Sequence, residues 1–117
     1  MTTSTTTLGK RAENRVAIYL KKNGWQILSR NFRRIACELD IVALKKGSLL
    51  VAEVKYRAFW QEGGDLQQLI GERKKKHLVK GVLSFLSSYE VSYQTISFEL
   101  FLVSGQKVNT LNRYPIN

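Results

Sequence analysis

The segment from Ser48 to Tyr56 constrains the fold most strongly, because it is an apolar strand that ends in opposite charges. Leu49-Leu50-Val51-Ala52 contains no polar position, which is typical of a strand that is covered on both faces. Glu53 and Lys55 follow at the end of this run. Unpaired buried charge costs free energy, so these two side chains need partners. This strand is therefore expected to be buried beneath other elements, and the charged residues at its end are candidates for a functional site.

The preceding strand, expected from Glu38 to Leu44, is joined to it by a short turn. Lys45-Lys46-Gly47 predicts a tight hairpin. If Lys46 and Gly47 form a two-residue turn, the ladder places Asp40 directly opposite Glu53. Directly opposed Cβ atoms lie about 4.5–5.5 Å apart. Two carboxylates at about that separation repel by roughly 3 kcal/mol at an effective dielectric constant near 20.

The same register adds two more charged residues to the cluster. Glu38 falls opposite Lys55, and the alternation of side chains puts both on the face of Asp40 and Glu53. A lysine offsets part of the repulsion, and a divalent cation would offset it fully. Mg²⁺ takes oxygen ligands and commonly uses one or two carboxylates together with a substrate phosphate. An ordinary cross-strand ion-pair cluster is the alternative, and the residues alone leave both interpretations open.

A third carboxylate is expected on the first helix, from Leu8 to Lys22. On a helical wheel Glu13 lies between Leu20 and Ala17, on the apolar side that faces the sheet. Glu13 is therefore a candidate for the same cluster. Pairing with Arg15 or with an arginine of a strand is the alternative.

The remaining pattern predicts an α/β protein in the order α-β-β-β-α-β-β, with helices flanking a central mixed sheet. A flexible tail is expected over residues 1–8 and a single domain over residues 9–117. The other expected elements are strands at Trp25–Phe32, Ile96–Val103 and Lys107–Leu111 and a helix at Gln67–Tyr89.

The net charge of the chain indicates the class of molecule that it binds. The chain has 19 Lys and Arg against 9 Asp and Glu, a net charge of +10 on 117 residues. Such a surface attracts polyanions, and nucleic acid is the usual one. No amphipathic basic helix with aromatic anchors and no span of about 20 apolar residues favours a membrane. The single Cys37 cannot form an internal disulfide, and the polar N-terminus lacks the centre of a secretory signal, so the expected location is the cytoplasm.

The basic residues at the start of the second helix are expected to bind phosphates. Lys74 and Lys75 are the main candidates, with support from Arg73, Lys76 and Arg57. Phosphate contacts carry no sequence code, so recognition of nucleic-acid shape is expected. In the loop after the third strand, Phe59 and Trp60 are candidates either for stacking on a base or for packing.

Asp40, twelve intervening residues, and Glu53-Val54-Lys55 resemble the signature of the PD-(D/E)xK nuclease superfamily. From Gly9 to Val103, nearly the whole chain resembles the YraN-like bacterial family, which is related to archaeal Holliday-junction resolvases. The matching segments are Gly9-Lys10-Arg11-Ala12-Glu13, Asn23-Gly24-Trp25, Asn31-Phe32-Arg33, Glu38-Leu39-Asp40-Ile41-Val42 and Val51-Ala52-Glu53-Val54-Lys55-Tyr56-Arg57, followed by a lysine-rich helix start. Two departures are Cys37, where the family usually has glycine, and Glu99, where it usually has aspartate.

The resemblance implies a core of the restriction-endonuclease type and an endonuclease acting on branched or structured DNA. It implies Glu13, Asp40 and Glu53 around Mg²⁺, with Mn²⁺ as the alternative, and Lys55 beside the attacking water. Glu38 is then a candidate to hold Lys55. A two-fold dimer would suit a symmetric junction. The alternatives are a nucleic-acid-binding module that keeps the scaffold without turnover and an adaptor for other proteins.

Overall fold

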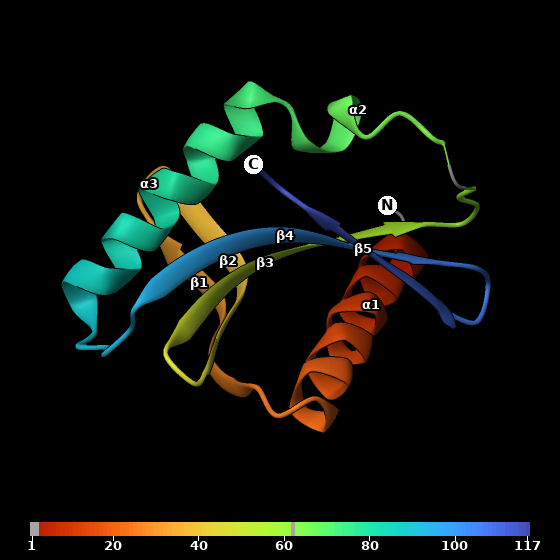
Figure 1. Cartoon of the computed structure of the whole chain (residues 1–117). Coiled ribbons are helices and arrows are strands. Elements are labelled where there is room, and N and C mark those ends of the chain that lie inside the picture. The colour runs from red at the N-terminus through yellow and green to blue at the C-terminus, as the bar shows by residue number, and fades with distance from the viewer. Residues whose placement is uncertain (1–2, 62) are drawn as a thin grey trace.

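The computed structural model describes residues 3–61 and 63–117, with side chains from residue 7 onward, and has one mixed sheet between helices. Helix α1 (Thr3–Lys22) covers one face. Helices α2 (Gln67–Ile70) and α3 (Glu72–Ser88) cover the other face, so the sheet lies between two helical layers (Figure 1). This arrangement confirms the predicted α/β class and the flanking of the sheet by helices.

The sheet has five strands in the spatial order of the sequence. Neighbouring strands are antiparallel except β3 and β4, which are parallel, and α2 and α3 form the crossover between them. The strands are β1 (Gln26–Arg34), β2 (Cys37–Lys45), β3 (Ser48–Arg57), β4 (Thr95–Ser104) and β5 (Thr110–Pro115).

The central strand β3 has apolar residues on both faces because both helical layers pack against it. Leu49 and Val51 belong to the core beneath α3, whereas Leu50 and Ala52 belong to the core beneath α1. All four are fully buried. The apolar run that the sequence places before Glu53 is therefore the centre of the molecule.

The predicted hairpin between β2 and β3 is confirmed. Lys46 (φ 48°) and Gly47 (φ 79°) both have positive φ, as a two-residue hairpin turn requires. Lys45 pairs with Ser48, and the predicted register continues as far as Ile41 opposite Ala52.

The prediction of one helix from Gln67 to Tyr89 is wrong, because the helix is interrupted at Gly71. Gly71 is extended (φ −69°, ψ 179°) and separates α2 from α3. Leu69 and Ile70 of α2 pack in the same core as the apolar face of α3. The helical spacing of the later apolar residues carried no signal of this break.

The chain ends also differ from expectation. Helix α1 begins at Thr3 rather than at Leu8, and Met1 and Thr2 of the expected tail lie outside the described residues. The last strand begins at Thr110, because Val108 adopts a positive φ of 55° in the preceding turn. Within the described part of the chain, no helix is long and apolar enough to cross a membrane.

Two helical glycines should respond oppositely to substitution by alanine. A Cβ at Gly81 would lie 2.6 Å from Cδ2 of Leu39, a core residue, whereas a Cβ at Gly9 would meet nothing within 4 Å. We expect Gly81→Ala to lower the free energy of unfolding by about 1–2 kcal/mol, because overpacking exceeds the gain in helix propensity. Gly9→Ala should raise it by up to about 1 kcal/mol. Urea denaturation measures both, and a stabilised Gly81→Ala protein would contradict the close packing of α3 on β2.

Candidate active site

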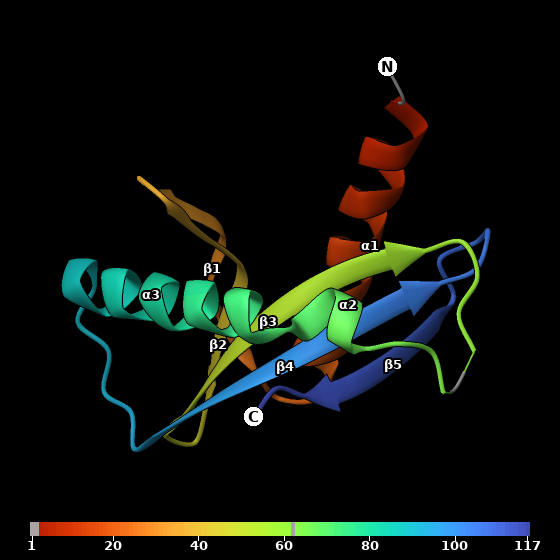
Figure 2. The same ribbon diagram turned by 90° about the horizontal axis from the view of Figure 1, so that it is seen from above.

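The candidate site lies where β2 separates from β3. Leu39 packs in the core beneath α3, but Ile41, two residues later, packs in the core beneath α1. Side chains two residues apart in a regular strand share a face, so the alternation is interrupted around Asp40. The ladder with β3 ends at the same place, with Ile41 opposite Ala52. Figure 2 shows the outer part of the β1–β2 hairpin diverging from β3.

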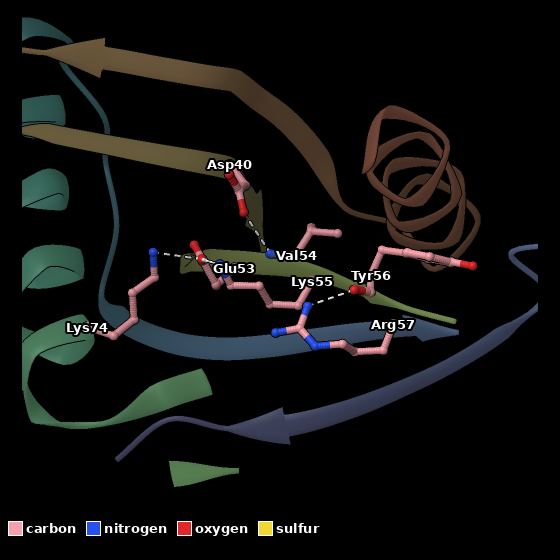
Figure 3. Close-up of polar contacts among 7 residues, drawn as sticks. All are labelled: Asp40, Glu53, Val54, Lys55, Tyr56, Arg57 and Lys74. Atoms are coloured by element: carbon pink, nitrogen blue, oxygen red, sulfur yellow. Dashed lines mark hydrogen bonds and ion pairs between the residues drawn. The ribbon is translucent and has the colours of Figure 1, made fainter. Parts of the chain in front are cut away.

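Asp40 occupies this point of separation. Beyond Ala52, the backbone N–H of Val54 has lost its partner strand on this side, and it donates a hydrogen bond to Oδ2 of Asp40 at 2.8 Å (Figure 3). The carboxylate thus replaces a backbone acceptor at the end of the ladder. This bond fixes Asp40 beside the charged end of β3.

The electrostatic environment of Asp40 opposes its ionisation. Burial, followed by the repulsion of Glu53, raises the pKa of Asp40 from 3.8 to about 7, although the bond from Val54 acts in the opposite direction. Glu13 adds a smaller repulsive contribution. Asp40 and Glu53 are therefore close neighbours, as predicted, although they are not a ladder pair. A cation between them would remove the repulsion.

Glu53 is a buried charge that two lysines neutralise. It is 3% exposed, and its Oε2 lies 2.8 Å from Nζ of Lys74 and 3.4 Å from Nζ of Lys55. Lys55 is its neighbour on β3, whereas Lys74 reaches it from the first turn of α3 (Figure 3). The sequence indicated Lys55 beside Glu53, but it did not indicate the contact with Lys74.

The predicted position of Glu38 opposite Lys55 is wrong. Glu38 pairs with Arg33 across the β1–β2 ladder, its Oε2 lies 3.5 Å from Nε of Arg33, and its side chain is 62% exposed. The interruption at Asp40 is the physical reason, because it turns residues before Asp40 away from the face predicted by strict alternation. In this structure Lys55 is held by Glu53 instead.

Glu13 lies at the edge of the cluster. Its side chain is 20% exposed, and its Oε1 is 3.7 Å from Nη2 of Arg30 on β1. It therefore makes the ion pair with a strand arginine that the sequence left open, while it still acts on Asp40. Over residues 3–61 and 63–117, no three Asp, Glu, His or Cys side chains gather closely enough to bind a metal ion by themselves. Asp40 and Glu53 are the central pair of oxygen donors.

A basic hollow of about 390 Å³ opens beside Lys55. Its cationic lining comes from β3 and from the start of α3, and glutamine side chains of α2 complete it. The charged and titratable residues that line it are Lys55, Arg57, Arg73, Lys74 and His77. Three of the five predicted phosphate-binding residues therefore gather here, together with His77, for which the sequence suggested no role.

The other two predicted phosphate-binding residues face a different direction. Lys75 and Lys76 line a separate hollow of about 480 Å³ against Phe98 and Ile116. Lys75 also pairs with Glu72 at 3.5 Å. Helical periodicity separates the lysine run into two faces, and only one of them adjoins the candidate site.

The two aromatic residues after β3 have different environments. The indole Nε1 of Trp60 donates a hydrogen bond to the hydroxyl of Tyr114 at 3.1 Å, and the ring packs against the core beneath α3. Phe59 is largely exposed. Trp60 thus takes the packing role, one of the two that the sequence left open.

The raised pKa of Asp40 predicts an unusual pH dependence of stability. The folded-state pKa of Asp40, about 7, exceeds the ordinary 3.8. The contribution of Asp40 to the free energy of unfolding is therefore most favourable at low pH and is lost as pH rises through 7. In EDTA near pH 8, we expect Asp40→Asn to raise the free energy of unfolding by up to a few kcal/mol, since each pKa unit corresponds to about 1.4 kcal/mol. The gain should shrink near pH 5, where wild-type Asp40 is protonated.

Urea denaturation at both pH values measures this effect. Glu38→Gln is the matched control, because it neutralises an exposed carboxylate on the same strand. An Asp40→Asn protein that is no more stable than the wild type near pH 8 would contradict the electrostatic environment described here.

Comparison with known proteins gives one consistent family. Residues 12–103 match the model of Uncharacterised protein family UPF0102. A UPF0102 protein of Synechococcus sp. (strain JA-3-3Ab) is 35% identical over 104 residues, which cover 86% of this chain and 78% of that protein. A UPF0102 protein of Chlorobium phaeobacteroides is 30% identical over 112 residues, which cover 94% of this chain and 87% of that protein. The chain therefore belongs to family UPF0102.

Proposed function

We propose that this protein is a metal-dependent endonuclease that hydrolyses phosphodiester bonds in branched or structured DNA, resembling the Holliday-junction resolvases of the PD-(D/E)xK superfamily. One observation carries the proposal. The carboxyl groups of Asp40 and Glu53 repel each other, and Glu53 pairs with Lys55, which lines a basic hollow. Strongly shifted pKa values are common at functional sites, where charged groups are held close together for chemistry.

The donor set fits Mg²⁺, with Mn²⁺ as the alternative. Asp40 and Glu53 offer carboxylate oxygens, Glu13 is a further carboxylate that acts on Asp40, and a DNA phosphate would supply more oxygen. When bound, the metal would neutralise charge on the scissile phosphate and lower the pKa of a bound water. A cation there would also offset the burial and the repulsion of Glu53 that together raise the pKa of Asp40.

The chain's own cations have separate tasks in this proposal. Lys55, on the strand that carries Glu53, orients the attacking water and counters developing negative charge on the phosphate. Arg57 and Arg73 line the hollow and hold neighbouring phosphates. Lys74 pairs with Glu53 in the absence of substrate, and in this proposal it contacts the scissile phosphate when the DNA enters.

A non-catalytic DNA-binding module on the same scaffold is the second candidate. The Lys74–Glu53 ion pair at 2.8 Å favours it, because a lysine in this position can satisfy the buried carboxylate permanently. The two candidates share the basic hollow and differ in turnover alone.

Cleavage of a labelled four-way DNA junction tests the function directly. We expect the wild type to cut with Mg²⁺ or Mn²⁺ and to stop cutting in EDTA. Asp40→Asn should reduce cutting by at least about 100-fold, the loss typical of removing one charge-stabilising group. Binding without cutting by the wild type, with either metal, would overturn the nuclease proposal in favour of the binding module.

Lys55→Ala separates catalysis from binding. We expect at least about 100-fold slower cleavage, because the water and the developing charge lose their cation. Affinity for the junction should fall only by the contribution of one cation in the hollow. Lys22→Ala, on the exposed end of α1, removes the same charge elsewhere and should cut normally. Wild-type cleavage by Lys55→Ala would exclude the proposed role of this lysine.

A further inference from the structure

The tip of the β1–β2 hairpin carries an exposed apolar side chain, Ile35, directly after two arginines. Ile35 is 97% exposed, a higher fraction than for any other large hydrophobic side chain in the described part of the chain. Arg33 and Arg34 precede it, and Ala36 closes the turn with a positive φ of 64°. Ile35 has no packing role in the structure, so its exposure calls for an explanation outside the core.

The arginines of the tip are held in place rather than free. The guanidinium of Arg34 lies 4.5 Å from the ring centroid of Phe32, and its Nη1 donates a hydrogen bond to the carbonyl of Arg33 at 2.7 Å. Arg33 also contacts Glu38 at 3.5 Å, but its side chain is 75% exposed. Both cations therefore lie at the hairpin end, next to Ile35.

This tip continues the basic surface of the candidate site. A hollow of about 460 Å³ lies beneath it and is lined by Arg33, Arg34, Glu38, His77 and Lys80 among others. His77 also lines the hollow beside Lys55. The two hollows therefore adjoin at His77, and together they form a basic path from the hairpin tip, across α3, to Lys55.

We propose that the hairpin tip, Arg33–Ala36, is a second DNA contact, in which the two arginines hold phosphates of a duplex arm and Ile35 inserts between its bases. This inference rests on the proposed function. Proteins that kink DNA use apolar wedges such as isoleucine in this manner, with arginine and lysine beside them. The five-residue step from Ile35 to Asp40 spans at most about 17 Å in an extended chain. At about 3.4 Å of rise per base pair, the wedge meets the duplex within about five steps of the scissile phosphate.

Binding experiments with the full chain in EDTA test the tip separately from cleavage. The probe is a fluorescein-labelled four-way junction, titrated at several salt concentrations and followed by anisotropy. We expect Arg33→Gln/Arg34→Gln to reduce the log–log salt slope by about 1.8, which corresponds to two phosphate contacts. Lys21→Gln/Lys22→Gln, which removes the same charge from the exposed end of α1, should leave the slope unchanged.

The wedge has its own readout. Ile35→Ser should weaken junction binding about tenfold without changing the salt slope, because burial of one apolar side chain supports a loss of that size. A 2-aminopurine placed within about five base pairs of the scissile phosphate should brighten on binding of the wild type, as its base unstacks, and stay quenched with Ile35→Ser. Thermal unfolding of each variant verifies the fold.

Two results would overturn this inference. One is an arginine double variant with the same salt slope as the lysine double variant. The other is an Ile35→Ser protein with wild-type affinity and wild-type 2-aminopurine fluorescence. Neither result depends on turnover, so a wild type that binds but does not cut would refute the nuclease proposal and leave the hairpin contact standing.

Discussion

The rest of the structure depends on how the buried charge of Glu53 is neutralised. The residue directly follows the apolar run of β3 that is covered on both faces, where an isolated carboxylate would be very costly. Lys55 from the same strand and Lys74 from α3 provide the compensation. This ion-pair cluster joins the start of α3 to the centre of the sheet. It also explains why the basic end of α3 lies beside the candidate site rather than over an apolar part of the sheet.

Much of this site could be predicted from local sequence. The turn at Lys46-Gly47 fixes the register, so Asp40 had to come close to Glu53. The apolar run before Glu53 identified the buried strand, and the helical wheel placed Glu13 on the side facing the sheet. These are short-range rules, since hairpin register and helix periodicity follow from backbone geometry alone.

The remainder depended on tertiary geometry that no local pattern encodes. Glu38 was misplaced because strict alternation fails where β2 changes faces at Asp40. The contact between Lys74 and Glu53 depends on the break at Gly71, which sets the direction in which α3 starts. Neither feature has a composition or periodicity signal. The contact of Lys74 arises because the crossover through α2 and α3 must return to the sheet beside β3, at an angle that no local pattern encodes.

The interruption of β2 at Asp40 links the two halves of the proposed DNA surface. Before Asp40, β2 leaves β3 and pairs with β1 alone, so the hairpin tip projects beyond the sheet (Figure 2). The same departure frees the Val54 N–H that fixes the Asp40 carboxylate. Arg30 of β1 then ties this hairpin to α1 through Asn14 at 2.8 Å and Glu13 at 3.7 Å. The hairpin that carries the tip is therefore anchored by both of its strands, through Arg30 on β1 and through Asp40 on β2, directly beside the carboxyl pair.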